Sequence, residues 1–181
     1  MIVAQEKRKK NITEYILYMW QVEDLIRALD FDPQKIYNTL VAQYKVDEAK
    51  KKEISAWYDN LTLMMQKEQL QKSGHLQMLV NLSDDLNRFH TALITQQIDS
   101  AYSSLYAGIK GDLELVREKS GKDDHDVDVT LNTLYIILML KMKKQEVSEG
   151  TQNAVWKFGN FLGHLSMLFK TYEAGDLELV Y

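Results

Sequence analysis

The residues of this sequence best suited to chemistry are four histidines and one carboxylate that borders apolar positions. Helical bundles often hold a di-iron or di-manganese centre, which needs Glu-x-x-His on two helices so that carboxylate and imidazole share one face. The residues three positions before the histidines are Lys72, Asn87, Lys122 and Phe161, and none of them is acidic. No His-x-x-x-His or His-Glu-x-x-His pair occurs either. We therefore predict no metal and no other cofactor.

Three residues are the candidates for a ligand-binding site: Glu23, His90 and His164. Both histidines lie on or beside apolar stripes, where a buried, hydrogen-bonded imidazole is the ordinary explanation and an acid–base role needs a partner within reach. Glu23 borders the apolar stripe of its helix, and a buried carboxylate is costly unless it is paired. Arg27, one turn further on, is the simpler partner for Glu23 on a solvated helix.

Motifs that activate a nucleophile are missing. The sequence has no Gly-x-Ser-x-Gly elbow, no Ser-x-x-Lys with a companion motif and no glycine-rich phosphate loop. It also has no cysteine, which excludes disulfides, thiolate metal sites and a cysteine nucleophile. We predict no catalytic residue, and the function leans away from catalysis.

The charge pattern bears on nucleic acids and other anionic partners. The formal net charge is −4, so the whole chain has no basic field that would attract nucleic acid. Lysine-rich clusters occur at 7–10, 50–52 and 141–144. Nucleic-acid binding would need these clusters to form one patch with interleaved aromatic residues, whereas lysine-rich helix faces are usually solvated surface. We do not expect a nucleic-acid partner.

The uncharged runs and the first residues of the sequence bear on membrane insertion and export. The longest uncharged runs, 129–140 and 158–169, fall short of the ~20 residues that cross a bilayer. The first residues lead directly into the charged stretch 5–10, without the apolar segment and cleavage site of a secretory signal. We expect no membrane span and a cytoplasmic location.

Apolar residues recur at steps of three and four through most of the chain, which is the helical period. The stripes cover 12–29, 36–44, 54–65, 76–93, 98–116, 131–142 and 155–172. Residues 75–119 form either one kinked helix or two helices broken near 95–97. No segment alternates with the period of a half-buried strand. The sequence predicts an all-α fold, an up-and-down bundle of six or seven helices, with a single domain over 1–175 and a short tail over 176–181.

Local signals mark the ends of these helices. Asp32 before Pro33, Asp47 and Ser148 are expected to cap helix starts. Lys-Ser-Gly at 72–74 and at 119–121 is expected to end two helices, each with a glycine in the left-handed conformation. The helix over 131–142 is apolar on most sides, which favours a central position.

Two further features concern packing. Gly159-x-x-x-Gly163 permits the close approach of another helix, within the bundle or across a soluble dimer. The ten tyrosines and three tryptophans suit interfaces and cores equally well.

Two regions also resemble a known family. The first comprises 1–12, MIVAQEKRKKNI, and 15–27, YILYMWQVEDLIR. The second comprises 131–140, LNTLYIILML, with Lys144, 146–148 and the final helix. Together they resemble an uncharacterised family of small bacterial helical proteins, a domain of unknown function, over nearly the full chain. The resemblance implies an intracellular helical protein and supplies no activity and no site residues.

These observations favour a non-catalytic cytoplasmic bundle that acts through protein–protein contacts, with self-association as a homodimer. The alternative is a small-ligand-binding protein or enzyme with a pocket between helices, in which Glu23, His90 and His164 are the polar groups. A third interpretation is weak binding of nucleic acid or an anionic surface through the lysine clusters.

Overall fold

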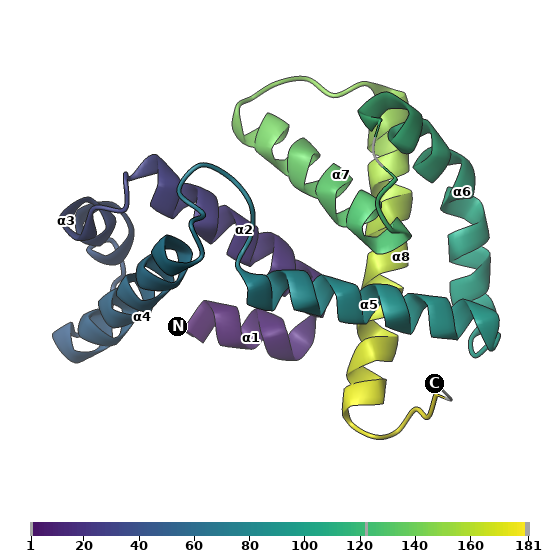
Figure 1. Ribbon diagram of the computed structural model, residues 1–181, viewed down its shortest axis with the longest axis horizontal. Helices are drawn as coiled ribbons and strands as arrows, with labels where there is room; N and C mark the ends of the chain where they lie inside the picture. The colour runs from purple at the N-terminus through teal and green to yellow at the C-terminus, as the bar shows by residue number, and fades with distance from the viewer. Residues whose placement is uncertain (1, 122, 180–181) are drawn as a thin grey trace. The chain divides into compact units, whose positions relative to one another are not determined.

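The structure is a computed structural model that describes residues 2–121 and 123–179 (Figure 1). Within these residues it contains only helices, and no strand occurs among them. The helices are α1 (Ile2–Lys10), α2 (Ile12–Ala28), α3 (Pro33–Ile36), the π-helical η1 (Tyr37–Val41), α4 (Glu48–Lys67), α5 (Gln77–Thr95), α6 (Ser100–Ser120), α7 (Asp126–Met142) and α8 (Glu149–Glu173). The predicted all-α fold is confirmed.

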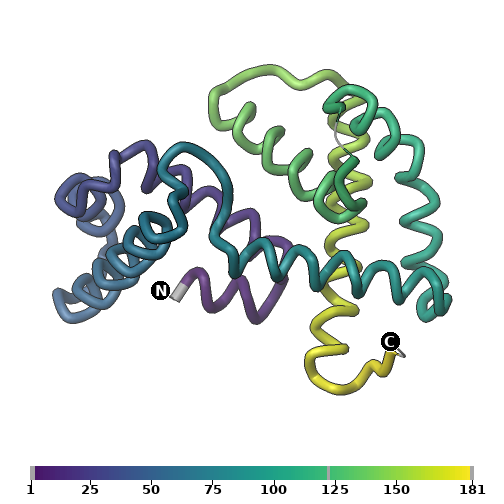
Figure 2. The backbone as a smooth tube through the Cα atoms, viewed as in Figure 1, coloured from purple at the N-terminus to yellow at the C-terminus, as the bar shows by residue number. Residues whose placement is uncertain are grey.

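More helices are present in the described residues than the six or seven expected. One reason is that Asn11 separates α1 from α2, whereas the apolar stripe of the sequence begins only at Ile12. Another is that the short helix after Pro33 changes into the π-helical η1. Figure 2 traces the backbone of this N-terminal part of the chain.

The chain divides into two compact units. The described residues of unit 1 lie at 2–8 and 14–81, and those of unit 2 lie at 9–13, 82–121 and 123–179. The single domain over 1–175 therefore stays a prediction. Residues 180–181 of the predicted tail lie outside the described residues, and 176–179 form no helix.

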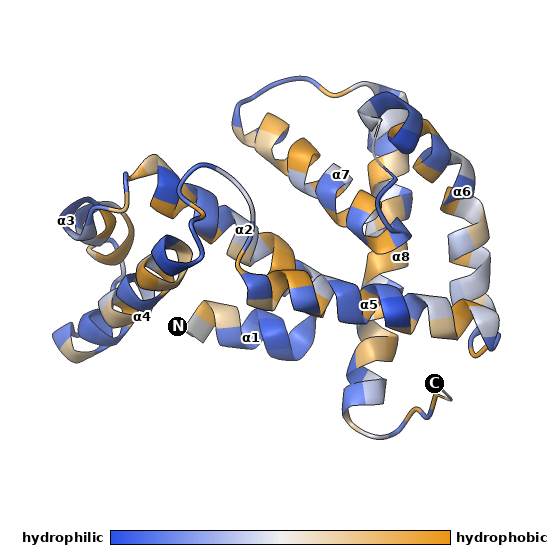
Figure 3. Ribbon diagram, in the orientation of Figure 1, coloured by the Kyte–Doolittle hydropathy of each residue, from blue (hydrophilic) through white to orange (hydrophobic). Residues whose placement is uncertain are grey.

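The core of unit 1 is built on the predicted stripe of α2. Ile16, Met19 and Ile26 are at most 1% exposed, and Ile54 and Met65 of α4 are also buried. Burying one side chain of this size contributes roughly 1.5–3 kcal/mol. Along α2 and α4, apolar and polar residues are interspersed, as the hydropathy colours of Figure 3 show.

The expected caps at helix starts are confirmed. The carboxylate of Asp32 accepts hydrogen bonds from the backbone N–H groups of Gln34 and Lys35, with Pro33 as the first helical residue. Asp47 accepts from the N–H of Lys50 at 2.7 Å. In unit 2, Ser148 accepts from the N–H of Thr151 in the first turn of α8.

The expected end of α4 at Lys72-Ser73-Gly74 is wrong. The helix ends at Lys67, where Gln69 takes a left-handed conformation with a φ of 58° and the N–H of Leu70 donates to the carbonyl of Met65. This is the Schellman pattern that glycine normally serves. Gly74 also has a positive φ, of 93°, but it lies in the loop 68–76 between α4 and α5.

Unit 2 contains most of α5 and all of α6, α7 and α8. Residues 75–119 form two helices, because α5 ends at Thr95 and Asp99 starts α6 by accepting a hydrogen bond from the N–H of Tyr102. Helix α8 packs against both α6 and α7 (Figure 1). Four aromatic side chains in the core of this unit are almost fully buried: Phe89, Tyr102, Phe158 and Phe161.

The central position expected for α7 is wrong for its second half. Val127, Val129 and Leu131 are buried, but Ile136 is 58% exposed and Met142 is 61% exposed. An apolar pattern on most sides of a helix indicates that the helix avoids water, but it does not identify what covers each side.

Candidate functional site

The three candidate residues belong to different units. Glu23 lies on α2 in unit 1, whereas His90 on α5 and His164 on α8 lie in unit 2.

Glu23 is a fully buried carboxylate with two partners, His75 and Leu76, at the end of the loop 68–76. Its side chain is 1% exposed. One oxygen accepts a hydrogen bond from the N–H of Leu76 at 2.8 Å, and the other lies 2.6 Å from Nδ1 of His75. Because the N–H of Leu76 precedes the first turn of α5, Glu23 compensates a donor that the helix itself cannot satisfy.

Arg27, the simpler partner expected for Glu23, bonds to other groups. Its Nη1 donates to Asp24 at 2.7 Å, its Nε donates to the carbonyl of Leu70 at 2.9 Å, and its Nη2 donates to the carbonyl of Gly74. Glu23 and Arg27 lie one turn apart on α2. Together they hold the loop 68–76 against this helix.

The imidazole of His75 also stacks on Trp20. The two ring centroids lie 4.3 Å apart and the ring planes differ by 18°. Trp20, Glu23 and His75 thus form a contact set that we call the loop clamp, with Arg27 beside it. The arrangement accounts for a buried carboxylate through structure alone, without a bound ligand.

In unit 2, His90 is 6% exposed and has a protein group at each ring nitrogen. Its Nδ1 is hydrogen-bonded to the hydroxyl of Tyr102 at 2.7 Å, and its Nε2 lies 3.5 Å from the carboxylate of Asp126. A histidine that exchanges a proton with a ligand needs one nitrogen directed at that ligand. His90 would have to release one partner first.

Asp126 connects three helices. At the start of α7, its carboxylate accepts hydrogen bonds from the hydroxyl of Tyr106 at 2.6 Å and from the guanidinium of Arg117, both on α6, and it faces His90 on α5. The interaction with His90 lowers the pKa of Asp126, and the bonds from Tyr106 and Arg117 lower it further. Together they hold this pKa below its usual value, although burial acts in the opposite direction. We call these four residues the Asp126 network.

Other groups reinforce the same junction. Arg117 also donates to the carbonyl of Asp124 at 2.9 Å. Asn87 of α5 accepts from the N–H of Val127 and donates to Asp128 at 2.8 Å. The pKa of Tyr106 is raised to about 12 by burial and by its bond to Asp126, so its hydroxyl stays a donor at neutral pH.

His164 also lies beside Tyr102. The centroids of these two rings are 6.0 Å apart, and Nε2 of His164 lies 3.3 Å from the carboxylate of Asp99. The structure thus gathers His90 and His164 around one buried tyrosine. The hydrogen bond from the N–H of Tyr102, followed by the charge of His164, lowers the pKa of Asp99.

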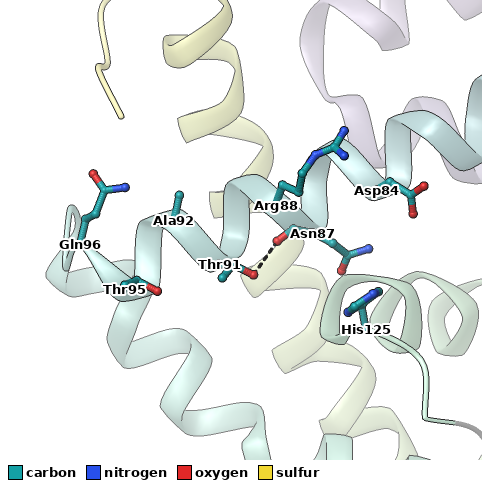
Figure 4. A pocket seen from close by; sticks show the side chains of 8 residues that line it. All are labelled: Asp84, Asn87, Arg88, Thr91, Ala92, Thr95, Gln96 and His125. Carbon is teal, nitrogen blue, oxygen red and sulfur yellow. Dashed lines mark hydrogen bonds between the residues drawn. The ribbon is translucent and has the colours of Figure 1, made fainter. Parts of the chain in front are cut away.

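A groove runs beside the Asp126 network. One pocket of about 600 Å³ lies along α5, and His125 faces it from the segment before α7, as Figure 4 shows. A second, more polar pocket of about 350 Å³ shares Asn87, Thr91, Thr95 and His125 with it and reaches His90. Among the three candidates, only His90 lines either of these two pockets. In the described part of the chain, no group of three or more His, Asp or Glu residues is arranged to hold a metal ion.

Sequence reasoning missed the residues that complete both sites. His75 lies 52 positions from Glu23, and Asp126 lies 20 positions from Tyr106. A signal for Asp126 existed, because an acidic residue in the first turn of a helix is favourably placed at the positive end of the helix dipole. No spacing rule could have identified its partners on α5 and α6.

None of the helices in residues 2–121 and 123–179 has the length and apolar character needed to cross a bilayer.

Comparisons with known proteins give one match, to a protein family. No curated protein and no solved structure shows significant similarity to the chain. One family profile matches residues 1–176, which is nearly the whole length. The chain belongs to the family described as Domain of unknown function (DUF4924).

Proposed function

We propose that this protein acts without catalysis, through contacts with other protein chains, and that it forms a homodimer through the outer face of α8. The observation that carries the proposal is the exposure of Trp156, whose side chain is 68% exposed although tryptophan is among the residues most often buried in interfaces. Met167 on the same helix is 53% exposed. The predicted cytoplasmic location remains part of this proposal.

The two exposed side chains share one face of α8 with two glycines. Trp156, Gly159, Gly163 and Met167 follow one another at steps of three and four, which places them in one stripe. A Cβ atom added at either glycine would meet no atom within 4 Å. Packing within the chain therefore does not require these glycines, although each costs about 1 kcal/mol relative to alanine inside a helix.

The stripe suits a second copy of the same helix. In a two-fold interface one surface meets itself, so a self-complementary face is required. An antiparallel pair of α8 helices would place Gly159 opposite Gly163 of the second copy and Trp156 near Met167 of the second copy. Contacts between a methionine sulfur and an aromatic ring contribute roughly 0.3–1.5 kcal/mol each.

The candidate polar residues support a non-catalytic function. Glu23 is bonded to the backbone of Leu76 and to His75, and His90 has a protein group at both ring nitrogens. Nε2 of His164 lies 3.3 Å from Asp99, but without the geometry of a hydrogen bond. Glu23 and His90, whose polar atoms face protein groups, stabilise the fold and are not directed at a substrate.

The test is the molar mass in solution. Light scattering coupled to size exclusion should give a dimer at tens of micromolar, and replacing Gly159 with leucine should raise the dissociation constant at least about tenfold, because a leucine separates the helices. Trp156→Ser should have a similar effect. Leu63→Ser is the matched control, since Leu63 on α4 is also 53% exposed. A monomeric wild-type protein, or equal dissociation constants for all variants, contradicts the proposal.

A further inference from the structure

A pocket of about 380 Å³ lies within unit 1, separate from the groove beside the Asp126 network and from the face of α8. Its lining comprises three tyrosines, two glutamines, one threonine and three aliphatic side chains, and none of these residues carries a charge at neutral pH. The residues come from α2, from η1 and the turn after it, and from α4. We call it the tyrosine pocket, after Tyr18, Tyr44 and Tyr58.

One wall of the tyrosine pocket is the π-helical η1. The N–H of Ala42 donates to the carbonyl of Tyr37 at 2.8 Å, five residues back, which is the wide turn of a π-helix. The side chain of Gln43 satisfies the carbonyl of Thr39 at 2.7 Å. Such turns are rare and frequently occur at functional sites. Here Thr39 and Gln43 both line the pocket.

The tyrosines supply aromatic surface and neutral hydroxyl groups. Tyr58 is 3% exposed, and burial raises its pKa. Burial also raises the pKa of Tyr18 to about 12. Both side chains therefore keep their protons at neutral pH and can donate a hydrogen bond. Leu25, which also lines the pocket, remains 40% exposed to solvent.

We propose that the tyrosine pocket binds a neutral, planar aromatic molecule that carries a hydroxyl or carbonyl group. The volume lies within the range of about 300–1,000 Å³ typical of small-molecule sites, at the end that suits one or two rings. Tyrosine rings and aliphatic side chains cover the faces of such a molecule. Its polar edge exchanges hydrogen bonds with the hydroxyl and amide groups of the lining, some of which, such as those of Gln43 and Tyr58, have partners within the chain. A charged molecule would lose hydration without an opposite charge to compensate it.

The groove of unit 2 carries this inference less well. Its two guanidinium groups are already paired, Arg117 with Asp126 and Arg88 with Asp85. In contrast, every side chain that lines the tyrosine pocket is uncharged, which suits a neutral molecule. The inference is independent of the proposed dimer, because α8 contributes no residue to this pocket.

The test uses 2-naphthol as the neutral probe, with 2-naphthoate and 2-naphthylmethylamine as its charged counterparts, in titration calorimetry of the full chain. We expect 2-naphthol to bind at least about tenfold more tightly than either charged compound. Nuclear Overhauser contacts between 2-naphthol and the rings of Tyr18 and Tyr58 should locate it in the unmodified protein. Absence of binding at about 1 mM, or contacts confined to other residues, overturns the proposal.

Variants test the same site through its volume. Leu25→Trp should fill the pocket and weaken 2-naphthol binding at least about tenfold, and its partial exposure allows the larger side chain. Leu63→Trp is the matched control, because Leu63 is an exposed leucine of unit 1 outside the pocket. Equal affinities in these two variants contradict the assignment. A result of either kind leaves the molar-mass test of α8 unaffected.

Discussion

Glu23 in unit 1 and Asp126 in unit 2 are both carboxylates shielded from water, with side chains 1% and 18% exposed, but they are compensated differently. Glu23 bonds to the backbone N–H of Leu76 and to the imidazole of His75, and these two residues are neighbours in the sequence. Asp126 bonds to side chains from two other helices. The first arrangement fixes a loop, whereas the second fixes the relative placement of α5, α6 and α7.

The comparison predicts a larger loss of stability in unit 2. Asp126→Asn removes the charge that Arg117 faces, and breaking a largely buried ion pair costs about 2–4 kcal/mol of unfolding free energy after allowance for its partial exposure. Urea denaturation at pH 7 measures the loss. The control is Asp85→Asn, which breaks the exposed pair with Arg88 and should cost less than about 1 kcal/mol. Equal losses would show that the Asp126 network does not join the helices.

The pH dependence should follow the same difference. Because the pKa of Asp126 lies below the ordinary value of 3.8, the unfolded state binds a proton before the folded state does. The stability that Asp126 contributes is therefore present above about pH 4 and is lost as the pH falls further. Urea midpoints between pH 6 and pH 3 should decrease more steeply for the wild type than for Asp126→Asn. Parallel slopes would contradict this assignment.

In unit 1 the expected effect is smaller and confined to the loop. Glu23→Gln keeps a carbonyl that can accept from the N–H of Leu76, so the unfolding free energy should fall by about 1–2 kcal/mol. Glu23→Ala leaves that N–H unsatisfied and should cost about 1 kcal/mol more. Hydrogen exchange at Leu76 should accelerate in the alanine variant far more than in the glutamine variant. The comparison fails if both variants accelerate it equally.

The helices could be predicted because their causes are local. Apolar spacing of three and four marks the buried face of α2, and the caps at Asp32, Asp47 and Ser148 bond within three residues of themselves. The end of α4 could not be predicted, because Gln69 occupies a conformation that usually favours glycine. Local preferences were overridden there by contacts of the loop 68–76 with Arg27.

The candidate sites could be predicted only in part, for a physical reason. Burial of Glu23 and His90 follows from their places on apolar stripes, and both are buried. Their partners depend on which helices meet, so His75 and Asp126 were beyond any rule based on helical spacing. The tyrosine pocket is the extreme case, because its wall is a π-helical turn that the apolar pattern of 36–44 does not distinguish from an ordinary helix.

The smallest effect expected concerns His75, and it separates the two halves of the loop clamp. His75→Asn removes the ring stacked on Trp20 and its contact with Glu23 but leaves the hydrogen bond from Leu76 to Glu23 in place. Since His75 is 30% exposed, the unfolding free energy should fall by about 1 kcal/mol or less. Urea denaturation measures it beside Glu23→Ala. A loss as large as that of Glu23→Ala would mean that the imidazole, and not the backbone N–H, compensates the buried carboxylate. Glu23 and Asp126 would then both depend on side-chain partners and would differ only in the number of helices that they join.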